Sequence, residues 1–292
     1  MRSGFVAVAG RPNVGKSTLV NALAGEKVAI VSDKPQTTRR RISAAVNGAL
    51  DGEPYQLVLV DLPGFQRPRD ALTEHMQHTV DVALANVDGF LFVLAVDERI
   101  GGGDRFIADR VFAAGPPVVM ALNKVDRVPP ARIAEQITEA AALGDLHALH
   151  PVSALVGDGL APLLRDLAGL LPEGPAYFGD GRRTDLPLEA QIAEIVREKA
   201  LELTREEVPH AISVEMEELD ADAGRVSARV WVETESQKGI VVGKGGVMIR
   251  TIGTRARPEV ELLLGRPVYL DLRVKVKPRW RRDEGALERL GI

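Results

Sequence analysis

The sequence contains no cysteine, which excludes disulfide bonds and thiolate metal sites. It also has no apolar run long enough to cross a bilayer, and its N-terminus, "MRSGFVAVAG", lacks the long apolar core of a signal peptide. The formal net charge is -4, which argues against a surface that is basic throughout. We therefore expect a cytoplasmic protein without a general nucleic-acid coat.

What is present is the composition of a folded protein. Of the 292 residues, 45% are hydrophobic and 27% are charged, which is enough for one large domain or two ordinary ones. The basic charge is concentrated near one end, because the stretch from Lys238 to Arg282 holds twelve basic residues and three acidic ones. This asymmetry indicates a nucleic-acid-binding region, and a solvated basic face is the alternative.

Two patterns of elements follow each other along the chain. Up to residue 171, β-rich runs such as "YQLVLVD" and "GFLFVLAVD" alternate with helical patterns, which predicts an α/β domain over 1–171 with a mostly parallel six-stranded sheet. A stretch rich in Pro and Gly, 172–187, is predicted to be a linker. Residues 188–292 follow the order helix, strand, strand, helix, loop, helix, strand, and we predict a small α+β domain with a C-terminal tail.

The stretch "GRPNVGKS" lies between a predicted strand and a predicted helix and fits the pattern G-x-x-x-x-G-K-[ST]. This pattern predicts a triphosphate site, because small residues let backbone N–H groups turn inward toward phosphate. Lys16 is expected to reach the β- and γ-phosphates and Ser17 to ligate Mg²⁺. The predicted nucleotide contacts in this segment are Gly10, Arg11, Pro12, Asn13, Val14, Gly15, Lys16, Ser17 and Thr18.

Two further loops indicate which base is bound. In "NKVD", the Asp126 carboxylate can accept two hydrogen bonds from guanine that adenine does not offer, while Asn123 holds the loop and the Lys124 stem covers the ring. After the sixth predicted strand, "SAL" is expected to offer a backbone N–H to the guanine oxygen from Ser153, Ala154 or Leu155. GTP and GDP are therefore the expected ligands.

The segments that sense the γ-phosphate are predicted at "KPQTTRRR" and "DLPG". Asp61 is placed to hold Mg²⁺ through water, and the Gly64 N–H to contact the γ-phosphate. Thr38, with Thr37 as the alternative, is expected to complete the magnesium shell when GTP is bound; a pair of strand-edge threonines is the competing explanation. Loss of the γ-phosphate would release both segments.

The machinery for hydrolysis departs from that of Ras-like enzymes. Phe65 occupies the position where they carry the glutamine that orients water, and Gln66 is displaced by one residue. We therefore expect slow basal hydrolysis, with Lys16, Asn13, Thr38 and Gly64 as the catalytic set. Asn13 suggests a K⁺ ion beside the β–γ bridge, as in similar GTPases that carry an asparagine there.

A second glycine loop, "GKGG" at 243–246, lacks the hydroxyl that a phosphate loop needs after its lysine. It fits instead the G-x-x-G loop of KH domains, which clamps nucleic-acid backbone, and the element order around it matches the type II arrangement. We predict that it binds single-stranded RNA. The expected contacts are Gly243, Lys244, Gly245, Gly246, Ile240, Val241, Arg250 and Lys275.

Three alternatives remain open at this point. The chain could be an ATPase or a small-molecule kinase on the same scaffold, or a KH protein with an inactive nucleotide domain, although intact Lys16, Ser17 and Asp61 argue against the last.

The pairs His75/His78 and His147/His150 lack a third metal ligand in register, so surface or packing roles are favoured. A monomer is the default expectation.

Taken together, "GRPNVGKSTLVNAL", "KPQTTRRRI", "DLPGF", "NKVD", "GKGG" and "RVKVKPRWRRDEGALERLGI" resemble the Era family of bacterial GTPases over nearly the whole chain. The resemblance implies a GTPase domain joined to a type II KH domain that binds the 3′ end of 16S rRNA and assists assembly of the 30S subunit. It also implies peripheral association with the inner face of the cell membrane. The sequence departs from the family pattern at Leu62, where threonine is usual, and at Lys244-Gly245, where asparagine-lysine is common. Both departures matter little, and the second is expected to alter the RNA contacts slightly.

Overall fold

The computed structural model describes all residues except 35, 65–68 and 180, and it divides into two compact units. The first comprises residues 1–29, 38–67 and 76–185, and the second comprises residues 30–37, 68–75 and 186–292. Within the described ranges, no helix is both long enough and apolar enough to cross a membrane.

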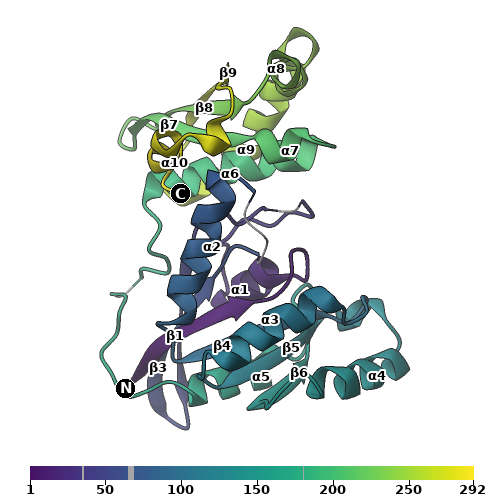
Figure 1. Cartoon of the computed structure of the whole chain (residues 1–292). Coiled ribbons are helices and arrows are strands. Elements are labelled where there is room, and N and C mark those ends of the chain that lie inside the picture. The colour runs from purple at the N-terminus through teal and green to yellow at the C-terminus, as the bar shows by residue number, and fades with distance from the viewer. Residues whose placement is uncertain (35, 65–68, 180) are drawn as a thin grey trace. The chain divides into compact units, whose positions relative to one another are not determined.

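The first unit is a six-stranded sheet with helices on both faces (Figure 1). Its strands lie in the order β2-β3-β1-β4-β5-β6, and only the pair β2/β3 is antiparallel. This confirms the predicted mostly parallel sheet. The elements are β1 (Arg2–Ala9), α1 (Lys16–Ala24), β2 (Ile42–Leu50), β3 (Glu53–Asp61), α2 (Ala71–Leu84), β4 (Gly89–Ala95), α3 (Gly102–Ala113), β5 (Val118–Asn123), η1 (Val125–Arg127), α4 (Pro130–Ala141), β6 (Ala148–Pro151) and α5 (Leu160–Gly169).

Two apolar cores explain why these runs become central strands. Every residue of β4, "GFLFVLA", is buried, as expected for a parallel strand covered on both faces. One core packs α1 and α5 against the sheet, through side chains such as Leu19 and Leu167. The other packs α2, α3 and α4 against the opposite face, through Val80, Ile107 and Ala140. The loops at the carboxyl ends of the strands are left free to form a site.

The segment predicted as a linker runs along the first unit up to Asp185. The Ser3 N–H donates to the Pro172 carbonyl at 2.9 Å, the Tyr177 N–H donates to Gln56 Oε1 at 2.6 Å, and the Ser43 hydroxyl donates to Asp185 Oδ2 at 2.7 Å. The segment is therefore attached to the edge of the first unit over most of its length.

The second unit is a three-stranded sheet covered on one face by helices. The strands lie in the order β7-β8-β9, with β7/β8 antiparallel and β8/β9 parallel. Side chains of α6 and α9, including Val196 and Ile252, bury the apolar face of this sheet. The elements are α6 (Leu188–Leu203), α7 (Val208–Ala211), β7 (Ser213–Asp220), β8 (Arg225–Val232), α8 (Glu235–Val242), η2 (Lys244–Gly246), α9 (Val247–Leu264), β9 (Tyr269–Val276), η3 (Trp280–Arg282) and α10 (Glu284–Leu290).

The order of these elements is the one predicted from the sequence, with a short α7 and the tail helix α10 in addition. Trp280 anchors the tail, because its side chain is fully buried and its indole N–H donates to the Ala211 carbonyl at 2.8 Å.

Candidate functional site

The loop between β1 and α1 depends on backbone that only glycine adopts easily. Gly15 has a φ of 97°, and a Cβ atom there would lie 2.2 Å from Nδ2 of Asn123. A side chain at this position would therefore be strained and would also collide with the neighbouring loop. Asn13 in the same loop has a φ of 66°, a left-handed conformation that asparagine tolerates better than other side chains.

Lys16 lies across this loop. Its Nζ donates to the carbonyls of Gly10 and Arg11, each at 3.0 Å, and its side chain is buried. Burial lowers the pKa of this ammonium, and the charge of Asp61 opposes that effect. The first turn of α1 thus holds a desolvated positive charge at the helix N-terminus, where phosphate binds well.

Three oxygen-bearing side chains meet beside Lys16. The Ser17 hydroxyl donates to Asp61 Oδ2 at 2.7 Å and lies 3.2 Å from the Thr38 hydroxyl, which lies 3.5 Å from the same Asp61 oxygen. Thr37 is not part of this group, because its hydroxyl donates to the Lys34 carbonyl at 2.6 Å. The structure therefore brings Thr38, rather than Thr37, to Ser17 and Asp61.

The Asp61 carboxylate is the strongest sign that this oxygen group is built for a cation. It is fully buried, and Oδ1 has no hydrogen-bond partner among the described residues. Burial raises the pKa of this carboxyl, while Lys16 and the hydroxyls of Ser17 and Thr38 oppose the rise. Hydroxyl and carboxylate oxygens are the ligands that hard cations such as Mg²⁺ prefer, so the donor set fits that ion.

Asn123 joins three loops at the carboxyl ends of the strands. Its Nδ2 donates to the Val14 carbonyl at 2.9 Å, and its Oδ1 accepts from the N–H groups of Lys124 at 2.8 Å and Ala154 at 3.0 Å. The Ser153 hydroxyl donates to Asp126 Oδ1 at 2.5 Å. The predicted base loops and the phosphate loop therefore form one connected site.

An acidic cluster that no motif predicts lies beside Arg11 and Lys124. Arg11 donates from Nε to Asp104 at 2.7 Å and from Nη2 to Glu98 at 2.7 Å, and Lys124 Nζ lies 3.5 Å from Asp97. The Arg11 side chain is thus engaged with acidic partners, and its expected nucleotide contact is left to its backbone. No sequence motif marks these three carboxylates; only their place after β4 and at the start of α3 could have suggested them.

The remaining predicted residues of this site have simpler surroundings. Gly64 lies close to the phosphate loop, since a Cβ atom there would be 3.0 Å from Cγ of Pro12. Thr18 continues α1, and Leu155 is 73% exposed after β6. Phe65 and Gln66, on which the expectation of slow hydrolysis rests, lie outside the described residues.

The second glycine loop joins α8 to α9. Gly243 has a φ of 71°, and a Cβ atom there would lie 2.8 Å from Cβ of Met248, so the turn requires glycine. Arg250 folds back on the loop and donates to the carbonyls of Gly245 at 2.6 Å and Gly246 at 3.1 Å. Lys244 is exposed at the tip and remains available to a ligand.

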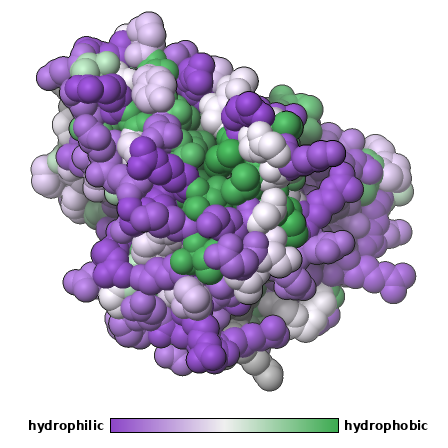
Figure 2. All heavy atoms as spheres, turned by 90° about the horizontal axis from the view of Figure 1, so that it is seen from above, coloured by the Kyte–Doolittle hydropathy of each residue, from purple (hydrophilic) through white to green (hydrophobic). Residues whose placement is uncertain are grey.

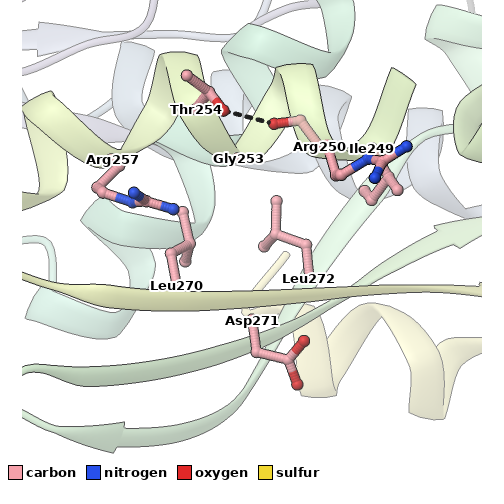
Figure 3. Close-up of a pocket in the computed structure, with 8 residues that line it drawn as sticks. All are labelled: Ile249, Arg250, Gly253, Thr254, Arg257, Leu270, Asp271 and Leu272. Atoms are coloured by element: carbon pink, nitrogen blue, oxygen red, sulfur yellow. Dashed lines mark hydrogen bonds between the residues drawn. The ribbon is translucent and has the colours of Figure 1, made fainter. Parts of the chain in front are cut away.

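A pocket of about 300 Å³ opens between α9 and β9, next to this loop (Figure 3). Figure 3 shows Leu270 and Leu272 pointing from β9 toward α9, while Asp271 points away. Gly253 contributes bare backbone to the helical wall, and Arg257 adds positive charge. The pocket surface is about equally polar and apolar, and leucine walls with basic edges suit an unpaired base with its phosphates. Its lining is Ile249, Arg250, Gly253, Thr254, Arg257, Leu270, Asp271 and Leu272.

The structure corrects one predicted RNA contact. Val241 is fully buried in the core of the second unit, because it lies on the face of α8 that packs inward, so its side chain cannot line a groove. Ile240 and Val247 are exposed, at 47% and 59%. Lys275 is exposed on β9 and is not part of the pocket lining. The view in Figure 2 shows an apolar patch bordered by hydrophilic side chains.

The histidines do not suggest a metal site. The His75 ring lies 2.6 Å from Glu284 and the His150 ring 2.8 Å from Asp166. Over the residues that the structure describes, no group of three or more His, Cys, Asp or Glu side chains is arranged to hold a metal ion. The oxygen group of Ser17, Thr38 and Asp61 is of a different kind, since two of its members are hydroxyls.

Comparison with known proteins gives a consistent result for both units. The family of 50S ribosome-binding GTPases matches residues 5–124 and the KH domain family matches residues 207–281. The chain is 45% identical over 299 residues to the GTPase Era of Mycobacterium tuberculosis (strain ATCC 25618 / H37Rv), covering 99% of this chain and 98% of the relative. It is 46% identical to the GTPase Era of Mycobacterium sp. (strain JLS), covering 100% of this chain and 99% of that relative.

Two solved structures match over the whole chain. A crystal structure of an Aquifex aeolicus Era variant bound to GDP and AlF4⁻ gives a TM-score of 0.93 at 39% identity, covering 100% of this chain and 99% of that one. A crystal structure of Era in complex with MgGDPNP and nucleotides 1506–1542 of 16S ribosomal RNA gives a TM-score of 0.91, with the same identity and coverage.

Proposed function

The chain belongs to the Era family of GTPases, and from this premise we propose that it is a GTP-driven switch that binds the 3′ end of small-subunit ribosomal RNA and assists assembly of the 30S subunit. The observation that carries the proposal is its full-length similarity, at a TM-score of 0.91, to an Era that was solved with MgGDPNP and a segment of 16S ribosomal RNA. Family membership also argues against a small-molecule kinase, since the relatives are GTPases.

The nucleotide roles divide among three loops. Lys16 binds the β- and γ-phosphates, and the backbone of Gly10 to Ser17 encloses them. Asp126 accepts hydrogen bonds from the guanine edge, and the backbone of Ser153 to Leu155 faces the guanine oxygen. Asn123 acts mainly by holding these loops together, which is supported by its bonds to Val14 and Ala154.

Ser17, Thr38 and Asp61 would hold Mg²⁺. When bound, this ion neutralises charge on the β- and γ-phosphate oxygens. The unpaired buried oxygen of Asp61 supports this assignment. Thr38 is the proposed reporter of the γ-phosphate, because its hydroxyl lies 3.2 Å from Ser17 Oγ in the oxygen group.

For the hydrolysis step we propose that Asn13 helps to hold a K⁺ ion that offsets charge on the phosphates. Asn13 has a left-handed backbone conformation in the phosphate loop, which is consistent with a specialised role. Turnover measured in K⁺ and in Na⁺ buffers at equal ionic strength tests the idea. We expect faster turnover in K⁺, and equal rates would contradict it.

The RNA is bound through the second glycine loop and the pocket between α9 and β9. Lys244 would contact phosphate, and the apolar walls at Leu270 and Leu272 would receive an unpaired base. We also propose that the protein acts on the 30S subunit as a monomer in the cytoplasm, with peripheral attachment to the inner face of the membrane. These proposals rest on the family resemblance.

The deciding experiment is fluorescence anisotropy with an oligonucleotide from the 3′ end of 16S rRNA, first with GDP and then with a non-hydrolysable GTP analogue. We expect tighter binding with the analogue, and the ratio of the two affinities gives the coupling free energy. An oligonucleotide of scrambled sequence is the control. Equal affinities would overturn the switch but keep the RNA site, and absence of binding would overturn the RNA assignment.

A further inference from the structure

Helix α6 carries a run of buried charged side chains that the proposed nucleotide and RNA sites do not use. Glu194, Arg197, Glu198 and Lys199 are each less than 10% exposed. Such residues are almost never buried unless they are paired, because removing a charge from water is costly. A helix that only covered an apolar core would not need them, so this α6 charge cluster calls for an explanation.

Two members of the α6 charge cluster hold the segment 30–37, which belongs to the same unit. Arg197 donates from Nη2 to the Thr37 carbonyl and from Nε to Glu194 at 3.0 Å. At the other end of the segment, the Val31 N–H donates to Glu198 Oε1 at 2.8 Å. Both contacts are charge-assisted and shielded from water, which makes them stronger than ordinary hydrogen bonds.

The Thr37 carbonyl belongs to the peptide bond that leads into Thr38. A peptide unit is planar, so fixing its oxygen also fixes the nitrogen and Cα of Thr38. The Thr38 hydroxyl lies 3.2 Å from Ser17 Oγ and 3.5 Å from Asp61 Oδ2. The guanidinium of Arg197 therefore holds the backbone directly before a predicted magnesium ligand.

The α6 charge cluster also extends to the helix that lines the RNA pocket. Lys199 Nζ donates to Glu198 at 2.8 Å and lies 2.6 Å from Glu259 on α9. Burial alone would lower the pKa of Lys199, but its hydrogen bonds to Glu198 and Glu259 raise that pKa above its ordinary value. Lys199 is thus a permanent positive charge that ties Glu198 to α9.

One nitrogen of Arg197 is left over. Nη1 is buried and has no hydrogen-bond partner among the described residues. A buried donor without an acceptor is unfavourable, and the other two guanidinium nitrogens bind Glu194 and the Thr37 carbonyl.

We propose that Arg197 is a positioning residue for GTP hydrolysis, which sets the place of Thr38 by gripping the Thr37 carbonyl. The proposal rests on the proposed function, in which Thr38 ligates Mg²⁺ with GTP bound. Arg197 does not touch the nucleotide. Its effect is confined to the state in which Thr38 is ordered, so GTP binding depends on it and GDP binding does not.

The test uses the full chain with the double substitution Glu194→Gln/Arg197→Met, which removes the grip together with the carboxylate that pairs with Arg197. We expect the Mg²⁺ concentration for half-maximal binding of a fluorescent GTP analogue to rise tenfold or more, while GDP affinity stays within about twofold. Hydrogen exchange at the amides of residues 31–34 and 36–38 should become faster in the GTP-bound protein only. Turnover should fall in parallel.

Two controls separate positioning from a loss of stability. Thr204→Val removes a buried hydroxyl at the C-cap of α6, which donates to the Ala200 carbonyl at 2.7 Å; this variant should leave the Mg²⁺ midpoint unchanged. Arg197→Lys keeps a charge for Glu194 and should recover thermal stability but not the midpoint.

The proposed role of Arg197 would be overturned if the double variant had the same Mg²⁺ midpoint and the same exchange rates as the wild-type protein. Failure of the unchanged protein to bind GTP in a Mg²⁺-dependent way would instead overturn the proposed function, and with it the premise of this inference.

Discussion

At the scale of single residues, Asn123 shows how much of the nucleotide site depends on one side chain. Its amide makes three hydrogen bonds to three different loops and is buried at 2% exposure. Each of these bonds pairs the side chain with a backbone N–H or C=O group. The loops are therefore placed by the protein itself and are ready for a ligand.

Gly15 offers the sharpest residue-scale prediction. Gly15→Ala should lower the free energy of unfolding by about 1–3 kcal/mol because of its positive φ, and should abolish GDP binding because the new Cβ displaces the Asn123 amide. Gly25→Ala is the matched control, since Gly25 has a φ of 73° and nothing within 4 Å of a Cβ. It should share the stability loss but keep GDP affinity, as measured by urea unfolding and fluorescent GDP titration. Retained GDP binding in Gly15→Ala would refute the expected collision.

Asp61 gives a prediction about pH. Burial raises the pKa of the Asp61 carboxyl above its ordinary value of 3.8 in the folded state. At pH values between 3.8 and the folded-state pKa, the folded protein therefore holds more protons than the unfolded chain. The contribution of Asp61 to the free energy of unfolding is therefore present at low pH and lost as pH rises through the folded pKa. Asp61→Asn lacks this pH dependence. The free energy of unfolding of the variant, relative to that of the nucleotide-free wild-type protein, should therefore rise as the pH increases through that window and then level off. Urea unfolding from about pH 4 to pH 8 checks it, and a constant difference would contradict it.

At the scale of elements, α9 joins the glycine loop, the pocket and the core of the second unit. Its face with Ile252, Ala256 and Val260 is buried against the sheet, and the neighbouring face with Gly253 lines the pocket. Stability and RNA binding can therefore be separated on the same helix.

Gly253→Ala should make that separation visible. Alanine is favoured over glycine inside a helix by about 1 kcal/mol, and the new Cβ would lie 3.6 Å from Cδ1 of Leu272, an ordinary contact. The free energy of unfolding should rise by about 0.5–1 kcal/mol, while RNA affinity should fall roughly fivefold because the methyl group narrows the pocket. Gly169→Ala in α5, where a Cβ meets nothing within 4 Å, controls for helix propensity. Unchanged RNA affinity in Gly253→Ala would place the base elsewhere.

The sequence predicts elements well where period and motif agree, and less well where packing decides. The fully buried strand β4 and the helix after the phosphate loop follow from their patterns. By contrast, Pro258 suggests that α9 stops at Arg257, yet the helix continues to Leu264 because Val260 packs in the core. Strand β2 also escapes the pattern, since it is rich in small residues.

The residues of the nucleotide and RNA sites likewise include some that motifs identify and others that depend on packing. The motifs identify Lys16, Asp61 and Asn123 because their chemistry depends on local spacing. They do not reveal Arg197 or Glu98, since these act through partners 160 and 87 residues away in the sequence. The sequence predicts Val241 at the RNA surface because it shows that a helix is apolar but not which face of that helix turns inward.

At the scale of the whole molecule, charge is distributed unevenly, and this should govern RNA binding. The chain has a net charge of -4, yet residues 238–282 hold twelve basic and three acidic residues. RNA affinity should therefore fall steeply with salt, with a slope of about -0.7 in log K against log[salt] for each phosphate contacted. Lys244→Ala should reduce the steepness by roughly 0.7. Arg165→Ala, on an exposed position of α5, makes the same charge change in the first unit and should leave the slope as it is; equal slopes for both variants would argue against a phosphate contact at Lys244.

The assignment of residues 30–37 to the second unit also has a consequence for the order in which the protein is made. Val31 and Thr37 leave the ribosome long before their partners Glu198 and Arg197, which follow 167 and 160 residues later. At translation rates of roughly 5–20 residues per second, that interval is on the order of ten to thirty seconds. For most of that interval the first unit is itself incomplete, since it extends to Asp185, and throughout it the Thr37 carbonyl lacks Arg197 as its donor. A GTPase that is complete in this respect exists only after α6 of the RNA-binding unit has been synthesised.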